Sequence, residues 1–230
     1  MKILALEFSS PQRSVAVLRR DELHESHSLP GESGTCNARP SEITETGIGA
    51  MRALGMVEDV LRDAKLEREE IECLVVGLGP GSYTGIRATI ALMQGWQLAR
   101  EIKLLGISSV ECLAAQAQAN GLFGRVNIVV DAQRNEFYLA AYEISADNNQ
   151  ETEALKIVSL MEIKAREQRG EILIGPEVTR WFPKGHVLFP SAVMLATLAL
   201  SRTDFVRGEK LEPIYLREIS FVKAPPSRIL

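Results

Sequence analysis

Runs of apolar residues near the N-terminus predict strands. Residues 3–8 form an almost continuous apolar run, residues 14–18 are apolar and β-branched, and residues 24–29 alternate weakly after a polar turn. This pattern predicts a meander of three strands. Residues 30–40, which are small and polar, are expected to form a loop.

The apolar period then changes from two residues to between three and four. Between about residues 46 and 66 apolar side chains recur on one helical face, which predicts a helix. The face consists of Ala50, Leu54, Val57 and Leu61. Further methionine and valine side chains make it wider than one core contact needs, and we expect it to contact another subunit.

A strand, a glycine-rich loop and a second helix follow in direct succession. Residues 73–77 are a continuous apolar run typical of a buried strand, and the helix is predicted over about residues 86–101. The loop between them is the most unusual local feature of the chain. It consists of Gly79, Pro80, Gly81, Ser82, Tyr83, Thr84 and Gly85.

The residues of the loop allow two interpretations. Glycines supply positive φ, and backbone N–H groups at a helix start favour an anion, so the loop could cradle a phosphate. However, Gly85 is followed by Ile86 and Arg87 where a P-loop has lysine, and the glycines are spaced GxGxxxG instead of GxGxxG. The alternative is a tight turn that brings the helix close to its neighbour.

The helix after the loop carries a stripe of small side chains with Leu92, Trp96 and Leu98 beside it. The stripe consists of Ala88, Ala91, Gly95 and Ala99. A glycine inside a helix costs about 1 kcal/mol relative to alanine, so we expect close packing there. The small stripe, Leu92 and the face of the preceding helix together predict an interface with another subunit.

The second half of the chain repeats the order of elements. After a short strand at residues 103–106, Ser108 with Glu111 matches a capping box that begins a helix reaching about residue 120. Strands then follow at 126–130, 136–143 and 154–158. Ser159 with Glu162 matches another capping box.

Three strands followed by a helix therefore occur twice. We expect an α/β protein with two lobes, residues 1–110 and residues 111–230. Residues 193–200 are apolar and predict a core helix.

Composition excludes several classes of protein. The 230 residues are 46% apolar and 24% charged, with a net charge of -4. These values argue against a disordered chain, a coiled coil, a membrane protein and a strongly basic protein that coats nucleic acid. No apolar run approaches the roughly 20 residues of a membrane span, and we expect a cytoplasmic protein.

Cysteines and histidines are too few and too scattered for a metal or disulfide site. The cysteines are Cys36, Cys73 and Cys112, an odd number at wide spacing, and we expect reduced thiols. The histidines are His24, His27 and His186. The first two are three residues apart in a predicted strand and would point to opposite faces, so we expect no bound metal.

Five segments resemble the TsaB (YeaZ-type) family. GPGSYTGIR at 79–87 resembles the family signature GPGSFTGLR, and ILALEFSS at 3–10 is similar to the family's N-terminal strand. GISSVECLA at 106–114, DAQRNEFYLAAYE at 131–143 and PIYLR at 213–217 resemble further family segments. The resemblance therefore extends over nearly the whole chain.

The resemblance implies the two-lobed fold of actin, sugar kinases and Hsp70-type ATPases (the ASKHA fold), with duplicated mixed β-sheets. It implies a non-catalytic scaffold required for N6-threonylcarbamoyladenosine modification of tRNA, which binds and activates a TsaD-like catalytic subunit. The implied partners also include a TsaE-like ATPase and a second copy of the chain, with tRNA bound only indirectly. No cofactor and no catalytic residue are implied.

The alternative function is an ATP-binding small-molecule kinase or ATPase of the same fold. Such enzymes usually carry an Asp and glycine after the first strand and an Asp-x-Gly turn in the second lobe. This chain has Glu7 before Phe8, and Asp131 in a turn without glycine. Glu7 could hold a cation or could cap a turn, and Asp131, Arg134 and Glu136 are expected to form a solvated hairpin. Direct tRNA binding by this chain alone conflicts with its acidic balance.

Overall fold

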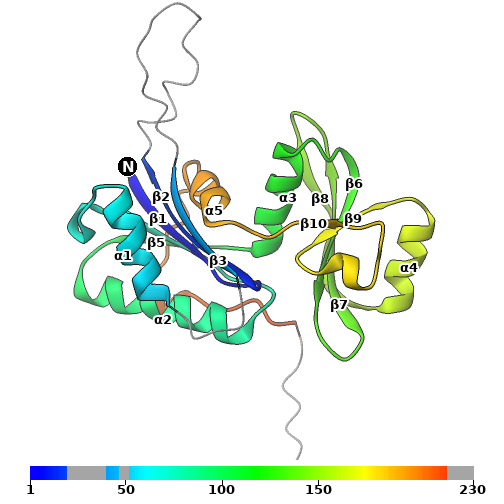
Figure 1. Cartoon of the computed structure of the whole chain (residues 1–230), viewed down its shortest axis with the longest axis horizontal. Helices are drawn as coiled ribbons and strands as arrows, with labels where there is room; N and C mark the ends of the chain where they lie inside the picture. The colour runs from blue at the N-terminus through cyan, green and yellow to red at the C-terminus, as the bar shows by residue number, and fades with distance from the viewer. Residues whose placement is uncertain (20–39, 47–51, 217–230) are drawn as a thin grey trace, which may run out of the picture.

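The computed structural model describes residues 1–19, 40–46 and 52–216, which form two lobes, each built on a five-stranded mixed sheet (Figure 1). The first sheet has the order β3-β2-β1-β4-β5 and the second the order β8-β7-β6-β9-β10. In both sheets the first three strands pair antiparallel and the last two join in parallel. The predicted two-lobed fold with duplicated mixed sheets is therefore confirmed.

The strands of the first sheet are β1 (Lys2–Glu7), β2 (Gln12–Arg19), β3 (Ser41–Thr46), β4 (Cys73–Gly77) and β5 (Lys103–Ile107). Those of the second sheet are β6 (Gly124–Asp131), β7 (Glu136–Ile144), β8 (Asn149–Ser159), β9 (Ile172–Gly175) and β10 (His186–Val187). Each sheet is covered by helices on both faces.

The first sheet lies between three helices. On one face α1 (Ala53–Asp63) and α2 (Tyr83–Ala99) pack against side chains that include Leu4 and Leu6 of β1. On the other face α5 (Ala192–Ala199) packs against Ile3 of the same strand. Because both faces are buried, the central strands are apolar at nearly every position, which explains the continuous runs in the sequence.

The second sheet lies between α3 (Ser109–Ala119) and α4 (Leu160–Gln168). Helix α3 follows the first sheet in the chain but packs against the second, and α5 follows the second sheet but packs against the first. These two helices touch each other between the lobes (Figure 1). The division at residue 110 stays a prediction. It assigns residues 192–216 to the second lobe, although α5 packs on the first sheet.

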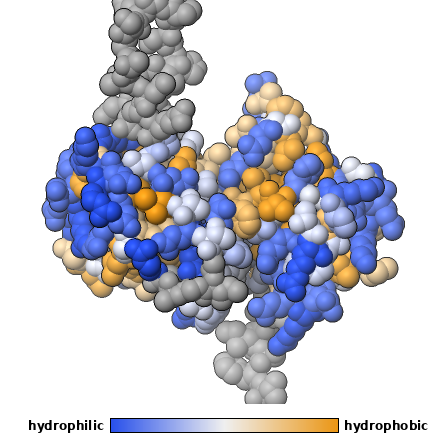
Figure 2. Space-filling model, viewed as in Figure 1, coloured by the Kyte–Doolittle hydropathy of each residue, from blue (hydrophilic) through white to orange (hydrophobic). Residues whose placement is uncertain are grey.

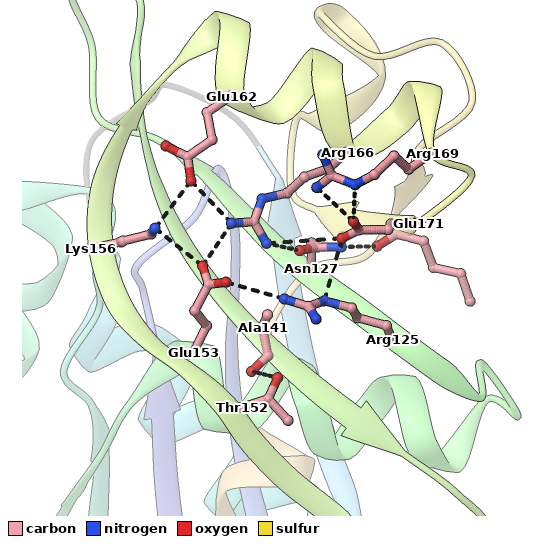
Figure 3. A network of polar contacts seen from close by, with 11 residues as sticks. Arg125, Asn127, Ala141, Thr152, Glu153, Lys156, Glu162, Arg166, Arg169 and Glu171 are labelled. Atoms are coloured by element: carbon pink, nitrogen blue, oxygen red, sulfur yellow. Dashed lines mark hydrogen bonds and ion pairs between the residues drawn. The ribbon is translucent and has the colours of Figure 1, made fainter.

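A buried arginine of α4 forms hydrogen bonds and ion pairs with the second sheet (Figure 3). The Nη1 of Arg166 donates to Asn127 Oδ1 at 2.9 Å, and its Nη2 donates to Glu153 Oε2 at 2.7 Å and Glu162 Oε1 at 3.0 Å. Arg166 is 5% exposed. Its guanidinium therefore joins β6, β8 and α4 at one point.

Some predicted boundaries were wrong. In the described part of the chain the third strand of the first meander, which pairs with β2 on the side away from β1, is β3, and α1 begins at Ala53 instead of near residue 46. The sequence of β3, SEITET, contains one apolar residue because this strand lies at a sheet edge, so its apolar pattern is weak. The strand predicted at 24–29, the loop at 30–39, His24, His27, Cys36 and Ala50 lie outside the described residues.

The helix caps were predicted in part. Ser108 and Ser159 are the N-caps of α3 and α4. Ser108 accepts from the Val110 N–H at 3.2 Å instead of from Glu111, whose carboxylate pairs with Arg202 at 2.8 Å. No helix among the described residues is long and apolar enough to cross a membrane.

Candidate functional site

The glycine loop follows β4 and packs against the turn that joins β1 to β2, and its last three residues, 83–85, form the first turn of α2, which begins at Tyr83 instead of near residue 86. The N–H of Ser82 donates to the Ser9 carbonyl at 2.7 Å, and Ser82 Oγ accepts from the Gly85 N–H at 3.3 Å. A Cβ atom at Gly81 would overlap the Ser9 carbonyl oxygen, and one at Gly85 would overlap that of Phe8. These glycines are needed for close backbone packing, which favours the tight-turn interpretation over a phosphate cradle.

The carboxylate of Glu7 is sealed in the core where the loop, β1 and α3 meet. Its Oε1 accepts from the Ser9 N–H at 2.7 Å, and its Oε2 accepts from Ser109 Oγ at 2.8 Å. Ser109 Oγ also accepts from the Gly79 N–H at 3.2 Å, and a Cβ at Gly77 would overlap the Glu7 carboxylate. Burial raises the pKa of Glu7, against the hydrogen bonds from Ser9 and Ser109 that lower it. This geometry favours a structural role for Glu7 over cation binding.

A cavity of about 460 Å³ lies between the two lobes. Ser10 and Ser82 line it from the first lobe, and Asp131, Phe137 and Trp181 line it from the second. Asp131 Oδ1 accepts from the N–H of residue 133 at 2.7 Å, as in the predicted hairpin. Glu7 does not reach this cavity. Among the described residues no group of three or more His, Cys, Asp or Glu side chains could hold a metal.

The residues predicted for an interface on α1 divide between core and surface. Val57 and Leu61 are 0% and 4% exposed and pack in the core between α1 and the first sheet, and Val57 also lines a hollow between α1 and α2. Their assignment to an interface stays a prediction. Leu54 is 56% exposed. The helical period identified the apolar positions of α1 but could not say which of them face the sheet.

The small stripe of α2 lies on the surface, beside two hollows between α1 and α2. Ala91, Gly95 and Ala99 are exposed, and Ala88 and Leu92 are partly buried. One hollow, of about 600 Å³, is lined by Leu54 and by α2 residues from Ala91 to Ala99, and the other, of about 340 Å³, by Leu54, Ala88 and Leu92. Figure 2 shows a pale orange band along the lower edge of the first lobe, where α2 lies in Figure 1. The structure therefore brings Leu54 together with the α2 stripe.

Gly95 has no packing partner within the described chain. A Cβ atom built there meets nothing within 4 Å. The close packing that the sequence predicts at Gly95 is therefore absent inside this part of the molecule. Its position on the surface leaves room for a molecule outside the chain.

An exposed stack of three side chains, which the sequence did not predict, borders the loop. The ring of Tyr83 stacks on that of Tyr215 with centroids 5.2 Å apart, and the Arg87 guanidinium lies 5.0 Å from the Tyr83 centroid. Arg87 Nη1 also donates to Tyr83 Oη at 2.5 Å. Two family-like segments, the loop motif and PIYLR, meet in this stack. Because both segments resemble the same family, their resemblance is the sequence feature from which this contact could have been predicted.

The segment from residue 205 to residue 216 carries Tyr215 along the edge of the first lobe. The N–H of Val206 donates to the Leu104 carbonyl of β5 at 2.8 Å, and the N–H of Ile214 donates to the Leu78 carbonyl at 2.9 Å. Between them, the N–H of Gly208 donates to Gln97 Oε1 of α2 at 2.6 Å. The segment is therefore fixed to β5, α2 and the start of the glycine loop.

Comparisons with known proteins agree in family and fold. The family model described as TsaD, tRNA N6-adenosine threonylcarbamoyltransferase, matches residues 50–210. The tRNA threonylcarbamoyladenosine biosynthesis protein TsaB of Escherichia coli K12 is 28% identical over 98% of this chain and 99% of that protein. TsaB of Haemophilus influenzae is 24% identical over 98% of each. The structure of YeaZ from Pseudomonas aeruginosa matches 94% of this chain and 99% of that one, with a TM-score of 0.72 and 24% identity.

Proposed function

The chain belongs to the TsaD family and within it to the TsaB (YeaZ-type) proteins, and we propose that it acts in tRNA threonylcarbamoyladenosine biosynthesis as a non-catalytic subunit. Its role is that of a scaffold that binds and activates a TsaD-like catalytic subunit. The names of the TsaB relatives, which match the chain over nearly their full length, support the pathway. The geometry of α2 supports the binding role.

The observation that carries this proposal is Gly95. A glycine in a helix interior costs about 1 kcal/mol relative to alanine, and no neighbour in the described chain explains it. Small residues on a helix surface allow another helix to approach closely. The exposed Leu54 and the hollows beside it supply apolar surface for that contact. We therefore propose that Leu54, Ala88, Ala91, Leu92, Gly95 and Ala99 bind the partner.

Two features of the first lobe support a non-catalytic role. Glu7, at the strand end where enzymes of this fold carry an aspartate, uses both carboxylate oxygens within the core. The N–H groups of Ser82 and Gly85, which a phosphate would need, already donate within the chain. The chain therefore leaves the transfer chemistry and the phosphate contacts with tRNA to its partner.

Substitutions on α2 test the proposed interface. Gly95→Leu places a large side chain on the contact surface and is expected to weaken binding to the TsaD-like subunit by about 100-fold, equivalent to roughly 3 kcal/mol. Gly95→Ala is the matched control and is expected to stay within about tenfold of wild type. Isothermal titration calorimetry measures both, and circular dichroism checks the fold.

The outcome that contradicts the interface is specific. If folded Gly95→Leu protein co-purifies with the TsaD-like subunit at wild-type stoichiometry, α2 is not the contact. Ala91→Glu, one turn away on the same stripe, gives an independent answer. We propose that a TsaE-like ATPase joins this complex and that the isolated chain pairs with itself through the same face, which size-exclusion chromatography of these variants also tests.

The alternative, an ATP-dependent enzyme, draws support from the cavity between the lobes. Its polar lining includes Ser10, Ser82 and Asp131. We expect no ATP binding by the isolated chain in calorimetry with Mg²⁺. ATP hydrolysis that disappears in the Asp131→Asn variant would favour the enzyme over the scaffold.

A further inference from the structure

We propose that the partner places on this face an apolar helix with a carboxylate near each end, and that Arg87 and Arg100 receive those carboxylates. The inference rests on the proposed function and adds the chemistry of the partner surface. It starts from the distribution of charge around α2.

The rim of the α1–α2 face is basic, although the whole chain carries a net charge of -4. Within the described part of the molecule, the charged residues that line the two hollows are Arg52, Arg68, Glu69 and Arg100. Arg87 is exposed beside Ala88 of the small stripe. Arg52 and Arg68 are paired with carboxylates of this chain, so the positive charge that can attract an acidic partner comes from Arg87 and Arg100.

Two of these arginines have no carboxylate partner among the described residues. Arg52 pairs with Glu45 at 2.8 Å, and Arg68 pairs with Glu58 at 2.7 Å. Arg100 instead donates to the backbone carbonyl of Arg68 at 3.2 Å, and Arg87 donates to the Tyr83 hydroxyl. A guanidinium has five N–H donors in a planar fork that matches a carboxylate. Both side chains therefore keep donors for an external acid.

The positions of the two arginines set the spacing of the acids. Arg87 lies in the second turn of α2, and Arg100 is its C-cap, 13 residues later. At 1.5 Å per residue they are about 20 Å apart along the helix axis. The small stripe runs between them. A partner helix that covers this stripe would need its two carboxylates at a similar separation.

Arg87 is held in place before the partner binds. Its guanidinium lies over the Tyr83 ring and donates to the Tyr83 hydroxyl, and Tyr215 stacks on the same ring and donates from its hydroxyl to the Tyr83 carbonyl at 3.4 Å. A side chain that is already ordered loses less conformational entropy on binding. Tyr215 is thus a positioning residue for Arg87.

The same charges argue against a second copy of the chain as the preferred occupant. In a twofold-symmetric pair the same surface lies on both sides of the contact. In an antiparallel pair of α2 helices, Arg87 of one copy would approach Arg100 of the other. These like charges would repel, whereas an acidic helix would neutralise them.

Charge reversal tests the inference in the complex with the TsaD-like subunit. Arg87→Glu and Arg100→Glu are each expected to weaken binding about tenfold at roughly 50 mM salt, with a smaller loss at about 0.5 M salt. The matched control is Arg180→Glu in the second lobe, where the guanidinium lies 4.9 Å from the Trp181 ring centroid. This control is expected to bind as wild type.

Failure of this inference differs from failure of the proposed function. If Gly95→Leu binds normally, the face itself is wrong and the inference falls with it. If Gly95→Leu loses binding but Arg87→Glu and Arg100→Glu bind as wild type at low salt, α2 is still the contact surface. The proposal that the partner helix carries carboxylates for these two arginines is then wrong. The proposal is also wrong if the chain binds a second copy of itself more tightly than it binds the TsaD-like subunit and if the two charge reversals leave this self-association unchanged.

The positioning role of Tyr215 has its own test. Tyr215→Ala is expected to weaken binding about threefold to fivefold because Arg87 loses its support, and Tyr215→Phe, which keeps the stacked ring, is expected to restore it. In an Arg87→Gln background Tyr215→Ala should have no further effect. Additive losses in that double variant, or equal losses for Ala and Phe, would contradict the role.

Discussion

The two lobes have the same strand order but differ in the connection between their last two parallel strands. In the first lobe α2, a 17-residue helix, connects β4 to β5. In the second lobe the connection from β9 to β10 contains the three-residue 3₁₀ helix η4 (Val178–Arg180), and β10 has two residues. The long crossover gives the first lobe an outward helical face, and the short one leaves the second lobe without its equivalent among the described residues.

The lobes also hold their covering helices in different ways. Helices α1 and α2 bury apolar side chains such as Met56 and Met93 against the first sheet. Helix α4 buries one apolar side chain, Ile163, and one charged side chain, Arg166, whose network supports the contact with the second sheet (Figure 3). The same topology is therefore compatible with an apolar and a polar attachment. The apolar attachment leaves Ala91, Gly95 and Ala99 on the outer side of α2 exposed.

The largest expected effect breaks the polar attachment. Arg166→Ala removes a buried guanidinium from Glu153, Glu162 and Asn127, and we expect the free energy of unfolding to fall by about 3 kcal/mol. The control is Lys156→Ala, which removes a 45% exposed ammonium from the same two glutamates and is expected to cost less than about 1 kcal/mol. Urea denaturation measures both. Equal losses would show that the network is only a surface feature.

The second prediction compares two glycines on α2. Gly85→Ala places a methyl group against the Phe8 carbonyl and is expected to destabilise the protein by about 2 kcal/mol. Gly95→Ala meets no neighbour and is expected to stabilise the protein by up to about 1 kcal/mol. Thermal and urea unfolding provide the measurement. If both variants changed the free energy of unfolding in the same direction, Gly85 would not differ from Gly95 as a buried position differs from a surface position of α2.

The smallest expected effect concerns pH and Glu7. Burial raises the pKa of Glu7 above its ordinary value of 4.5, so the folded protein binds this proton more tightly than the unfolded chain does. The stability it contributes is fully present below pH 4.5 and is lost as the pH rises through the raised pKa. Glu7→Gln has no such proton. The wild-type free energy of unfolding, relative to this variant, should therefore fall as the pH rises above 4.5 in urea titrations.

A relative stability of Glu7→Gln that does not change with pH would show that the carboxylate is solvated. Such a result would also revive Glu7 as a candidate cation ligand.

Much of the fold could be predicted from local pattern. The strands β1 and β4 are buried on both faces, so their apolar runs are continuous. Helices α3 and α5 were predicted almost to their ends because a serine cap or a dense apolar run marks them. Strand β3 was missed because an edge strand with alternating Glu and Thr has no clear apolar period.

The candidate site was predictable in part. The stripe of α2 could be identified because small residues at helical spacing are visible in sequence. The sequence does not predict that Leu54 of α1 is exposed while Val57 is buried, because this depends on which side of the helix packs against the sheet. The stack of Tyr83 on Tyr215 joins residues 132 positions apart, beyond the reach of any local period.

By itself, the sequence determined the buried strands β1 and β4, the helices α3 and α5, and the presence of a glycine loop before a helix with small residues. These properties depend on neighbouring residues along the chain, because backbone conformation and apolar period are local. The tertiary structure decided that Glu7 turns into the core, that Gly81 and Gly85 serve close packing, and that Gly95 meets no neighbour in the described chain. Those outcomes depend on which distant segment lies against each residue, and only the folded chain brings such segments together.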